Sequence, residues 1–198
     1  DVSGLMEGKG GALNGLSQYD AKRLFRVNKA KMDEKTILVV EGVQTLNEKL
    51  LPSLSDDETF RVFGSALTQP CIDTVSGIST RDNRLLRRIV KECRTKGVTV
   101  SSVIESWEGI EEEEKSQLFP YQNNADIMIN SALEYELGVL STYAMPLLRS
   151  IKPEEGKAYT TARRLMAFLD LVYPIPSEKV PSDSTLRAFM GGSVYNLT

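Results

Sequence analysis

The chain has 198 residues, of which 41% are hydrophobic and 26% are charged, and its net charge is −3. This length predicts one domain with a sizeable core, and the weakly acidic balance argues against a general nucleic-acid-binding surface. The sequence contains no histidine, which excludes histidine-based triads, histidine general bases and histidine metal ligands.

Cysteine usage and hydropathy indicate the compartment. Cys71 and Cys93 are too few for a disulfide framework or a zinc site, so we expect a reducing, cytoplasmic environment. No apolar run approaches the roughly 20 residues of a membrane span, and no signal sequence opens the chain, so we expect no membrane partner. The chain begins with Asp1 instead of methionine, and we therefore expect further residues upstream.

The strongest strand signal is TILVVEGVQTLN, residues 36–47. An apolar run at residues 37–40 is followed by Glu41 and Gly42, as at the carboxyl end of a buried parallel strand, where ligands bind in open sheets. The alternative is an ordinary core strand followed by an exposed turn, and the pattern alone does not separate the two.

Two further strands and five helices complete the predicted elements. Strands are expected at residues 59–65 and 126–130. Helices are expected at residues 82–96, 98–107, 131–148, 157–172 and 184–190. The first helix is capped by Ser79 or Thr80 and stopped by Gly97, and Ser131 caps the third. Strands that alternate with helices predict an α/β fold, a three-layer parallel sheet with right-handed crossovers.

The helix at residues 82–96 has two distinct faces. Its apolar face, expected to point inward, consists of Leu85, Leu86, Ile89, Val90 and Cys93. Its other face consists of Arg84, Arg87, Arg88 and Lys91, with Arg94 at the margin. This basic face is either solvated or turned towards an anion, and we weigh the two equally. The acidic run at residues 108–115, with four consecutive glutamates at 111–114, is expected to be a solvated helical face, and Trp107 is expected to be a packing residue.

Three blocks of the sequence resemble a known family. VVEGVQTLN, ISTRDNRLLRRIVKECRTKG and LFPYQNNADIMINSALEYELGVL resemble the bacterial-type branch of the uridine kinase/phosphoribulokinase family. The tail LRAFMGGSVY resembles the C-terminal extension of that branch. The resemblance implies a P-loop kinase sheet at residues 1–150, with a helical lid at about 82–118, and a helical extension at residues 151–198.

The implied reaction moves the γ-phosphoryl group of ATP to a hydroxyl of a nucleoside or related small molecule. Glu41 matches the strand-end glutamate near Mg²⁺, a hard cation that carboxylates suit. The residues implied to bind substrate are Tyr19, Asp20 and Arg84. The lid bases, which would steady the transferring phosphoryl group, are Arg88, Lys91 and Lys96. The resemblance is compatible with a homo-oligomer.

Several positions depart from the family pattern. The motif GxxxxGK[ST] is absent, and the GKGG run at residues 8–11 reads as a solvated turn. Gln44 stands where the family has histidine, and Lys91 and Lys96 stand where arginines are common. An acidic run in the lid is electrostatically unfavourable beside a triphosphate.

The missing phosphate-binding strand would leave a gap of roughly 10 Å between the strand that ends at Glu41 and the strand at residues 59–65. Three explanations stay open: a segment outside these residues, a cleaved chain, or a rebuilt sheet. The alternative to a kinase is therefore an inactive pseudokinase that serves as a structural or partner-binding module. Nucleic-acid binding through residues 84–94 is disfavoured, because the net charge is negative and aromatic residues are sparse.

Overall fold

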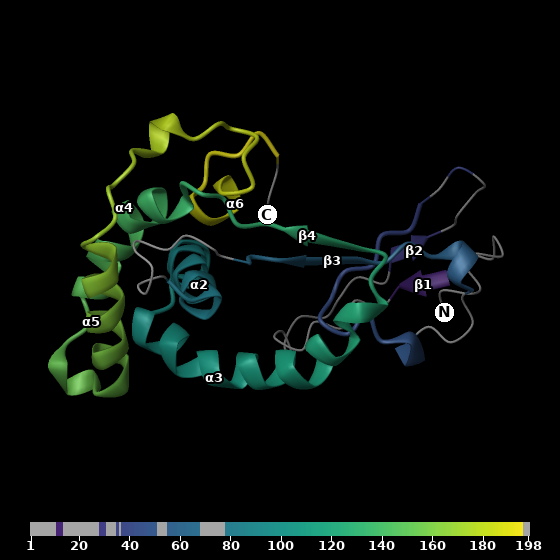
Figure 1. Ribbon diagram of the computed structural model, residues 1–198, viewed down its shortest axis with the longest axis horizontal. Helices are drawn as coiled ribbons and strands as arrows, with labels where there is room; N and C mark the ends of the chain where they lie inside the picture. Colours follow the sequence, from purple (N-terminus) through teal and green to yellow (C-terminus); the bar gives the residue numbers. More distant parts are fainter. Residues whose placement is uncertain are drawn as a thin grey trace. The chain divides into compact units, whose positions relative to one another are not determined.

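The computed structural model of the protein (Figure 1) describes residues 11–13, 28–30, 35, 37–50, 55–67 and 78–195. The chain divides into two compact units. The first comprises Asp1–Arg61 and Ser116–Asp126, and the second comprises Val62–Lys115 and Ile127–Thr198. Each unit is described by itself.

In the first unit, the described residues form short elements. Strands β1 (Gly11–Leu13) and β2 (Asn28–Ala30) pair in antiparallel fashion. Three 3₁₀ turns follow, η1 (Glu48–Leu50), η2 (Asp56–Glu58) and η3 (Phe119–Asn124). The two segments of this unit are joined where the Arg61 amide donates to Asp126 Oδ2 at 2.6 Å and the Asp126 amide donates to the Arg61 carbonyl at 2.9 Å.

The second unit contains a two-stranded parallel sheet. Strand β3 (Val62–Ser65) pairs with β4 (Ile127–Asn130) so that Val62 lies opposite Ile127, and the two strands run side by side in Figure 1. The Ser131 amide extends the ladder by donating to the Ser65 carbonyl at 2.8 Å. All four residues of β4 are exposed, whereas Phe63 of β3 is buried.

The prediction of a three-layer parallel sheet is wrong for the described part of the chain. That part is mostly helical and holds two sheets of two strands each. Residues 37–40, predicted as the central strand, form no strand, and Ile37 and Val39 are 87% and 84% exposed. A parallel strand needs hydrogen-bonded neighbours and helices that cover both faces, and residues 37–40 have neither among the described residues. An apolar run alone therefore did not produce a strand here.

Helix α2 (Thr80–Lys96) confirms the helix predicted at residues 82–96. The Ser79 hydroxyl accepts from the Asp82 amide at 3.0 Å, and Gly97 ends the helix in the left-handed region at φ 64°. Helix α3 (Val100–Gln117) joins the helical segment predicted at residues 98–107 and the helical acidic run predicted at residues 108–115 in one continuous helix. Repulsion between the glutamates does not break α3 at the acidic run, because two of these glutamates form ion pairs with α2, as shown below.

The C-terminal half of the second unit is helical. Helix α4 (Glu136–Arg149) starts later than predicted, and Ser131 does not cap it. The chain turns first, because the Asn130 side chain accepts from the Ala132 amide at 3.0 Å. Pro146 lies within α4 and does not end it. The remaining helices are α5 (Lys157–Leu169) and α6 (Arg187–Met190), with the 3₁₀ turns η4 (Pro153–Glu155) and η5 (Ser177–Lys179).

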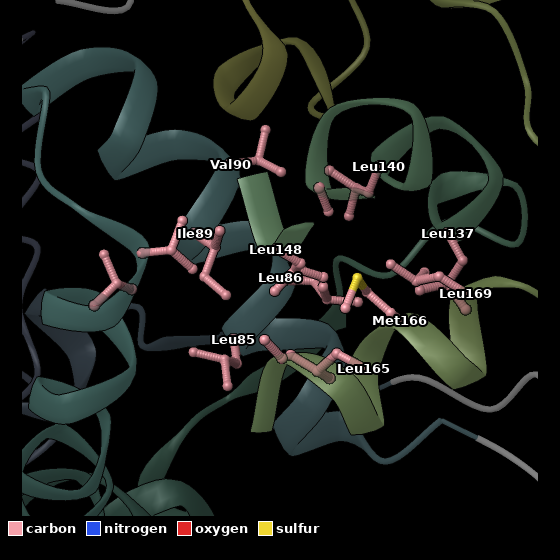
Figure 2. Packing of buried hydrophobic residues seen from close by; sticks show 14 of the residues in the cluster. Leu85, Leu86, Ile89, Val90, Leu137, Leu140, Leu148, Leu165, Met166 and Leu169 are labelled. Carbon is pink, nitrogen blue, oxygen red and sulfur yellow. The ribbon is translucent and has the colours of Figure 1, made fainter. Parts of the chain in front are cut away.

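The core of this unit forms where α2 packs on α4 and α6, and α4 packs on α5. Figure 2 shows the leucine-rich cluster that these helices share. The predicted inward face of α2 is confirmed, since Leu85, Leu86, Ile89 and Val90 are all buried. From α4 and α5 the cluster receives Leu137, Leu140, Leu148, Ala162, Leu165, Met166 and Leu169.

A close backbone approach fixes the C-terminal segment against α4. A Cβ added to Gly138 would lie 2.8 Å from the Tyr173 carbonyl oxygen and from side-chain carbons of Ile175. The Ile175 amide donates to the Gly138 carbonyl at 2.9 Å. Only glycine leaves room for this contact, since backbone atoms cannot move aside as a flexible side chain can.

The N-terminus of α2 is joined to α5 through Asp82. Arg164 donates from Nη1 and Nη2 to the two carboxylate oxygens of Asp82 at 2.6 and 2.7 Å. Burial raises the pKa of Asp82, but the hydrogen bonds and charge of Arg164, with Ser79 and Arg81, outweigh that effect and lower the pKa below its ordinary value. A carboxyl group whose pKa is lower in the folded state than in the unfolded chain stabilises the fold at pH values above the unfolded pKa. This stabilisation is lost as the pH falls through the pKa of the folded state.

We therefore expect Asp82→Asn to be less stable than wild type near neutral pH, with a difference that shrinks as the pH falls below about 4. Urea unfolding at a series of pH values measures the difference. The exposed residue Asp183 provides the control, and Asp183→Asn should follow the wild-type curve. A gap between Asp82→Asn and wild type that is the same at every pH would contradict the prediction.

Candidate functional site on helix α2

Four basic residues lie along one side of α2. Arg81, Arg84, Arg88 and Lys91 are separated by three, four and three residues, which places them in one row on a helix. We call these four residues the basic stripe. The sequence prediction placed three of them on the basic face and omitted Arg81.

The basic stripe meets two acids of α3. Arg81 donates from Nε and Nη2 to the two carboxylate oxygens of Glu111 at 2.6 and 2.8 Å. Arg84 donates from Nη2 to Glu114 Oε1. The hydrogen bond to Glu111 raises the pKa of Arg81. The expectation of a solvated acidic face is therefore wrong for Glu111 and Glu114, whereas Glu112 is exposed as predicted.

Trp107 lies under this contact. The Arg84 guanidinium lies over the indole ring at 5.6 Å from its centroid, a cation–π arrangement. Trp107 is 3% exposed, which confirms it as a packing residue. Within the described part of the chain, Trp107 Nε1, Glu114 Oε2 and Arg88 Nε are buried without a hydrogen-bond partner. The polar groups at this contact are thus only partly satisfied.

The three implied lid bases lie in different environments. Arg88 Nη2 and Lys96 Nζ both contact Glu92 Oε1, at 2.8 and 3.1 Å. Lys91 is exposed and has no ion-pair partner among the residues that the structure describes. Within the described part of the chain, Lys91 is thus the one of the three without an acidic partner.

Arg94, at the margin of the predicted basic face, binds α6. Its Nε donates to the Phe189 carbonyl at 2.9 Å and its Nη2 donates to the Ala188 carbonyl at 3.3 Å. These carbonyls belong to the last turn of α6, where unpaired carbonyl groups attract a cation. The role of Arg94 is structural.

Arg87 was predicted on the basic face of α2, turned either to solvent or to an anion, but it does not lie on the surface. Its side chain is buried and donates from Nε and Nη2 to the carboxylate of Glu136, which is 1% exposed. The Asn83 amide and the Leu133 backbone amide also donate to Glu136. Glu136 was not among the predicted site residues. Its signal was a carboxylate directly before the apolar run of α4, where burial requires a partner.

Burial raises the pKa of the Cys93 thiol, and Glu92 adds to that effect. A raised pKa disfavours the thiolate, which is the nucleophilic form. Cys93 is therefore unsuited to nucleophilic catalysis.

The candidate magnesium residue, Glu41, lies in the first unit and is exposed. It precedes a turn in which the Thr45 amide and hydroxyl both donate to the Gly42 carbonyl. Among the described residues, no three acidic or cysteine side chains gather in a way that could hold a metal ion. Mg²⁺ is usually bound by one or two carboxylates together with substrate phosphates and water, so these residues alone do not build its site. The implied substrate residues Tyr19 and Asp20 lie outside the described residues.

The chain matches no protein-family model, no curated protein and no solved structure. None of the helices in the described ranges is long and apolar enough to cross a membrane.

Proposed function

We propose that the protein is an ATP-dependent phosphotransferase that acts on a hydroxyl of a nucleoside or related small molecule in the cytoplasm. The observation that carries the proposal is the basic stripe of α2, which includes Arg88 and Lys91, two of the three lid positions that the resemblance implies. In phosphoryl transfer, positioning and charge neutralisation supply most of the catalysis. A row of cations on one helix is suited to both tasks.

Two residues of the stripe have separate parts in this proposal. Lys91 would contact phosphate oxygens directly, because it is exposed and has no acidic partner in the described chain. Arg84, held against Trp107, would position the substrate. The 198 residues contain no GxxxxGK[ST] motif, so the proposal requires a phosphate cradle from outside them.

Calorimetry of the full-length gene product with Mg²⁺-ATP tests the proposal, and a measurable heat of binding is expected. Lys91→Ala should lower the rate of phosphoryl transfer about a hundredfold or more, since it removes a cation from the developing charge. Arg163→Ala removes an exposed cation from α5 and should leave the rate unchanged. No binding of Mg²⁺-ATP, or equal rates for the two variants, would refute the kinase proposal.

The second candidate is a structural or partner-binding module without catalysis. Internal ion pairing favours it, because Arg81, Arg84 and Arg88 each have an acidic partner in their own chain. A protein that binds no Mg²⁺-ATP but folds cooperatively, with Lys91→Ala indistinguishable from wild type, would support this candidate.

A further inference from the structure

The contact between α2 and α3 has matched spacing on both sides. Arg81 and Arg84 are three residues apart, and so are their partners Glu111 and Glu114. Two carboxylates at this spacing offer the two guanidinium groups a row of oxygens. A polyphosphate chain offers the same kind of acceptor, with a larger charge and bidentate geometry at each phosphate.

The two pairs differ in burial. The side chains of Arg81 and Glu111 are 47% and 17% exposed, so solvent weakens this pair. The side chains of Arg84 and Glu114 are only 24% and 11% exposed. Glu114 is nevertheless half satisfied, since neither its Oε2 nor the neighbouring Trp107 Nε1 has a hydrogen-bond partner among the described residues. The contact combines an easily exchanged outer pair with an inner pair that is poorly satisfied.

We propose that Glu111 and Glu114 form an autoinhibitory latch, which occupies Arg81 and Arg84 until a polyphosphate group displaces the two carboxylates. The proposal rests on the proposed phosphotransferase function, because it concerns the regulation of the same basic stripe. It explains how an acidic run can lie beside a phosphate site. The acids hold the arginines in the resting protein, and the triphosphate of the substrate takes them over. Release then hydrates Glu114, whose carboxylate is half satisfied when the latch is closed.

Trp107 reports on the latch directly. It is the only tryptophan of the chain, and Arg84 lies over its ring. Removal of Arg84 from the ring changes the surroundings of the indole, so the intrinsic fluorescence of the full chain follows displacement without a label. Inorganic tripolyphosphate is the probe, because it carries the phosphate chain without a nucleoside.

Titration of wild type with tripolyphosphate is expected to give a saturable change in Trp107 fluorescence. The double variant Glu111→Gln/Glu114→Gln removes both competing charges and should bind the probe about three- to tenfold more tightly. Glutamine still accepts a hydrogen bond from each arginine, so the helices keep their contact. Glu111→Gln alone changes only the outer pair and should give a smaller gain in the same direction.

The matched control is Glu105→Gln/Glu112→Gln. It makes the same change in net charge at two exposed positions of α3 and should bind tripolyphosphate as wild type does. Equal affinities for the latch variant and this control would overturn the latch. If Mg²⁺-ATP is bound and turned over while the two variants behave alike, the latch fails and the proposed function stands. If tripolyphosphate binding follows the expected order but no phosphoryl transfer occurs, the proposed function fails and the latch stands.

Discussion

Glu136→Ala is expected to lower the free energy of unfolding by about 3–5 kcal/mol, because it leaves the buried guanidinium of Arg87 without its counter-charge. Glu136 is 1% exposed and Arg87 is 8% exposed, so water cannot replace the lost carboxylate. The change also removes the acceptor for the Asn83 side chain and the Leu133 amide. Equilibrium urea unfolding, followed by circular dichroism, measures the loss.

Two further variants separate the loss of the buried charge from the loss of the hydrogen-bond acceptor and from the removal of an exposed carboxylate. Glu134→Ala removes an exposed carboxylate two residues earlier and should change stability by less than about 0.5 kcal/mol. Glu136→Gln keeps an acceptor oxygen but removes the charge, and its loss should fall between those of the two alanine variants. A Glu136→Ala protein as stable as Glu134→Ala would show that the Arg87–Glu136 pair does not stabilise the fold.

Leu86→Ala is expected to cost about 2–5 kcal/mol, the range for truncation of a fully buried leucine. Leu86 has no exposed surface and lies in the cluster that α2, α4 and α5 share (Figure 2). Truncation removes its apolar contacts and leaves a cavity, because helices packed on several sides relax only in part. The midpoint of urea unfolding at constant slope measures the change.

Leu171→Ala is the matched control, because Leu171 is 64% exposed just beyond α5. Its stability should stay within about 0.5 kcal/mol of wild type. If both leucine variants lost the same stability, Leu86 would not belong to a close-packed core. A loss in Leu86→Ala with a strongly reduced slope would instead indicate that the truncated core no longer unfolds in one cooperative step.

The sequence predicted those features of the fold that depend on local signals. Helix α2 was predicted to within two residues because Ser79 caps it, Gly97 ends it and its apolar residues follow the helical period. The strand at residues 37–40 was predicted from an apolar run, but a strand also depends on neighbours that sequence order does not specify. The extent of the sheet was therefore overestimated.

The same distinction applies to the candidate site. The basic stripe could be predicted from helical spacing, because a row on a helix is a local property. The acidic partners of Arg81, Arg84 and Arg87 are not local, since Glu111, Glu114 and Glu136 come from other helices. Arg84 and Arg87, both predicted on the basic face of α2, are thus held by acids distant in sequence. The equal three-residue spacing of Arg81 and Arg84 and of Glu111 and Glu114 is the one sequence signal of the contact between α2 and α3.

The parallel pairing of β3 and β4 has a consequence for the order of folding. The two strands flank α2 and α3 in the chain, so pairing them closes a long loop that contains both helices. The conformational entropy lost on closing that loop must be offset by a ladder of only four residue pairs, and all four residues of β4 in this ladder are exposed. The helical cluster, in contrast, buries side chains of five helices of the described chain, α2 to α6. We therefore expect the strand pair to form last and to open first in the folded state, through local fluctuations that leave the helical core intact.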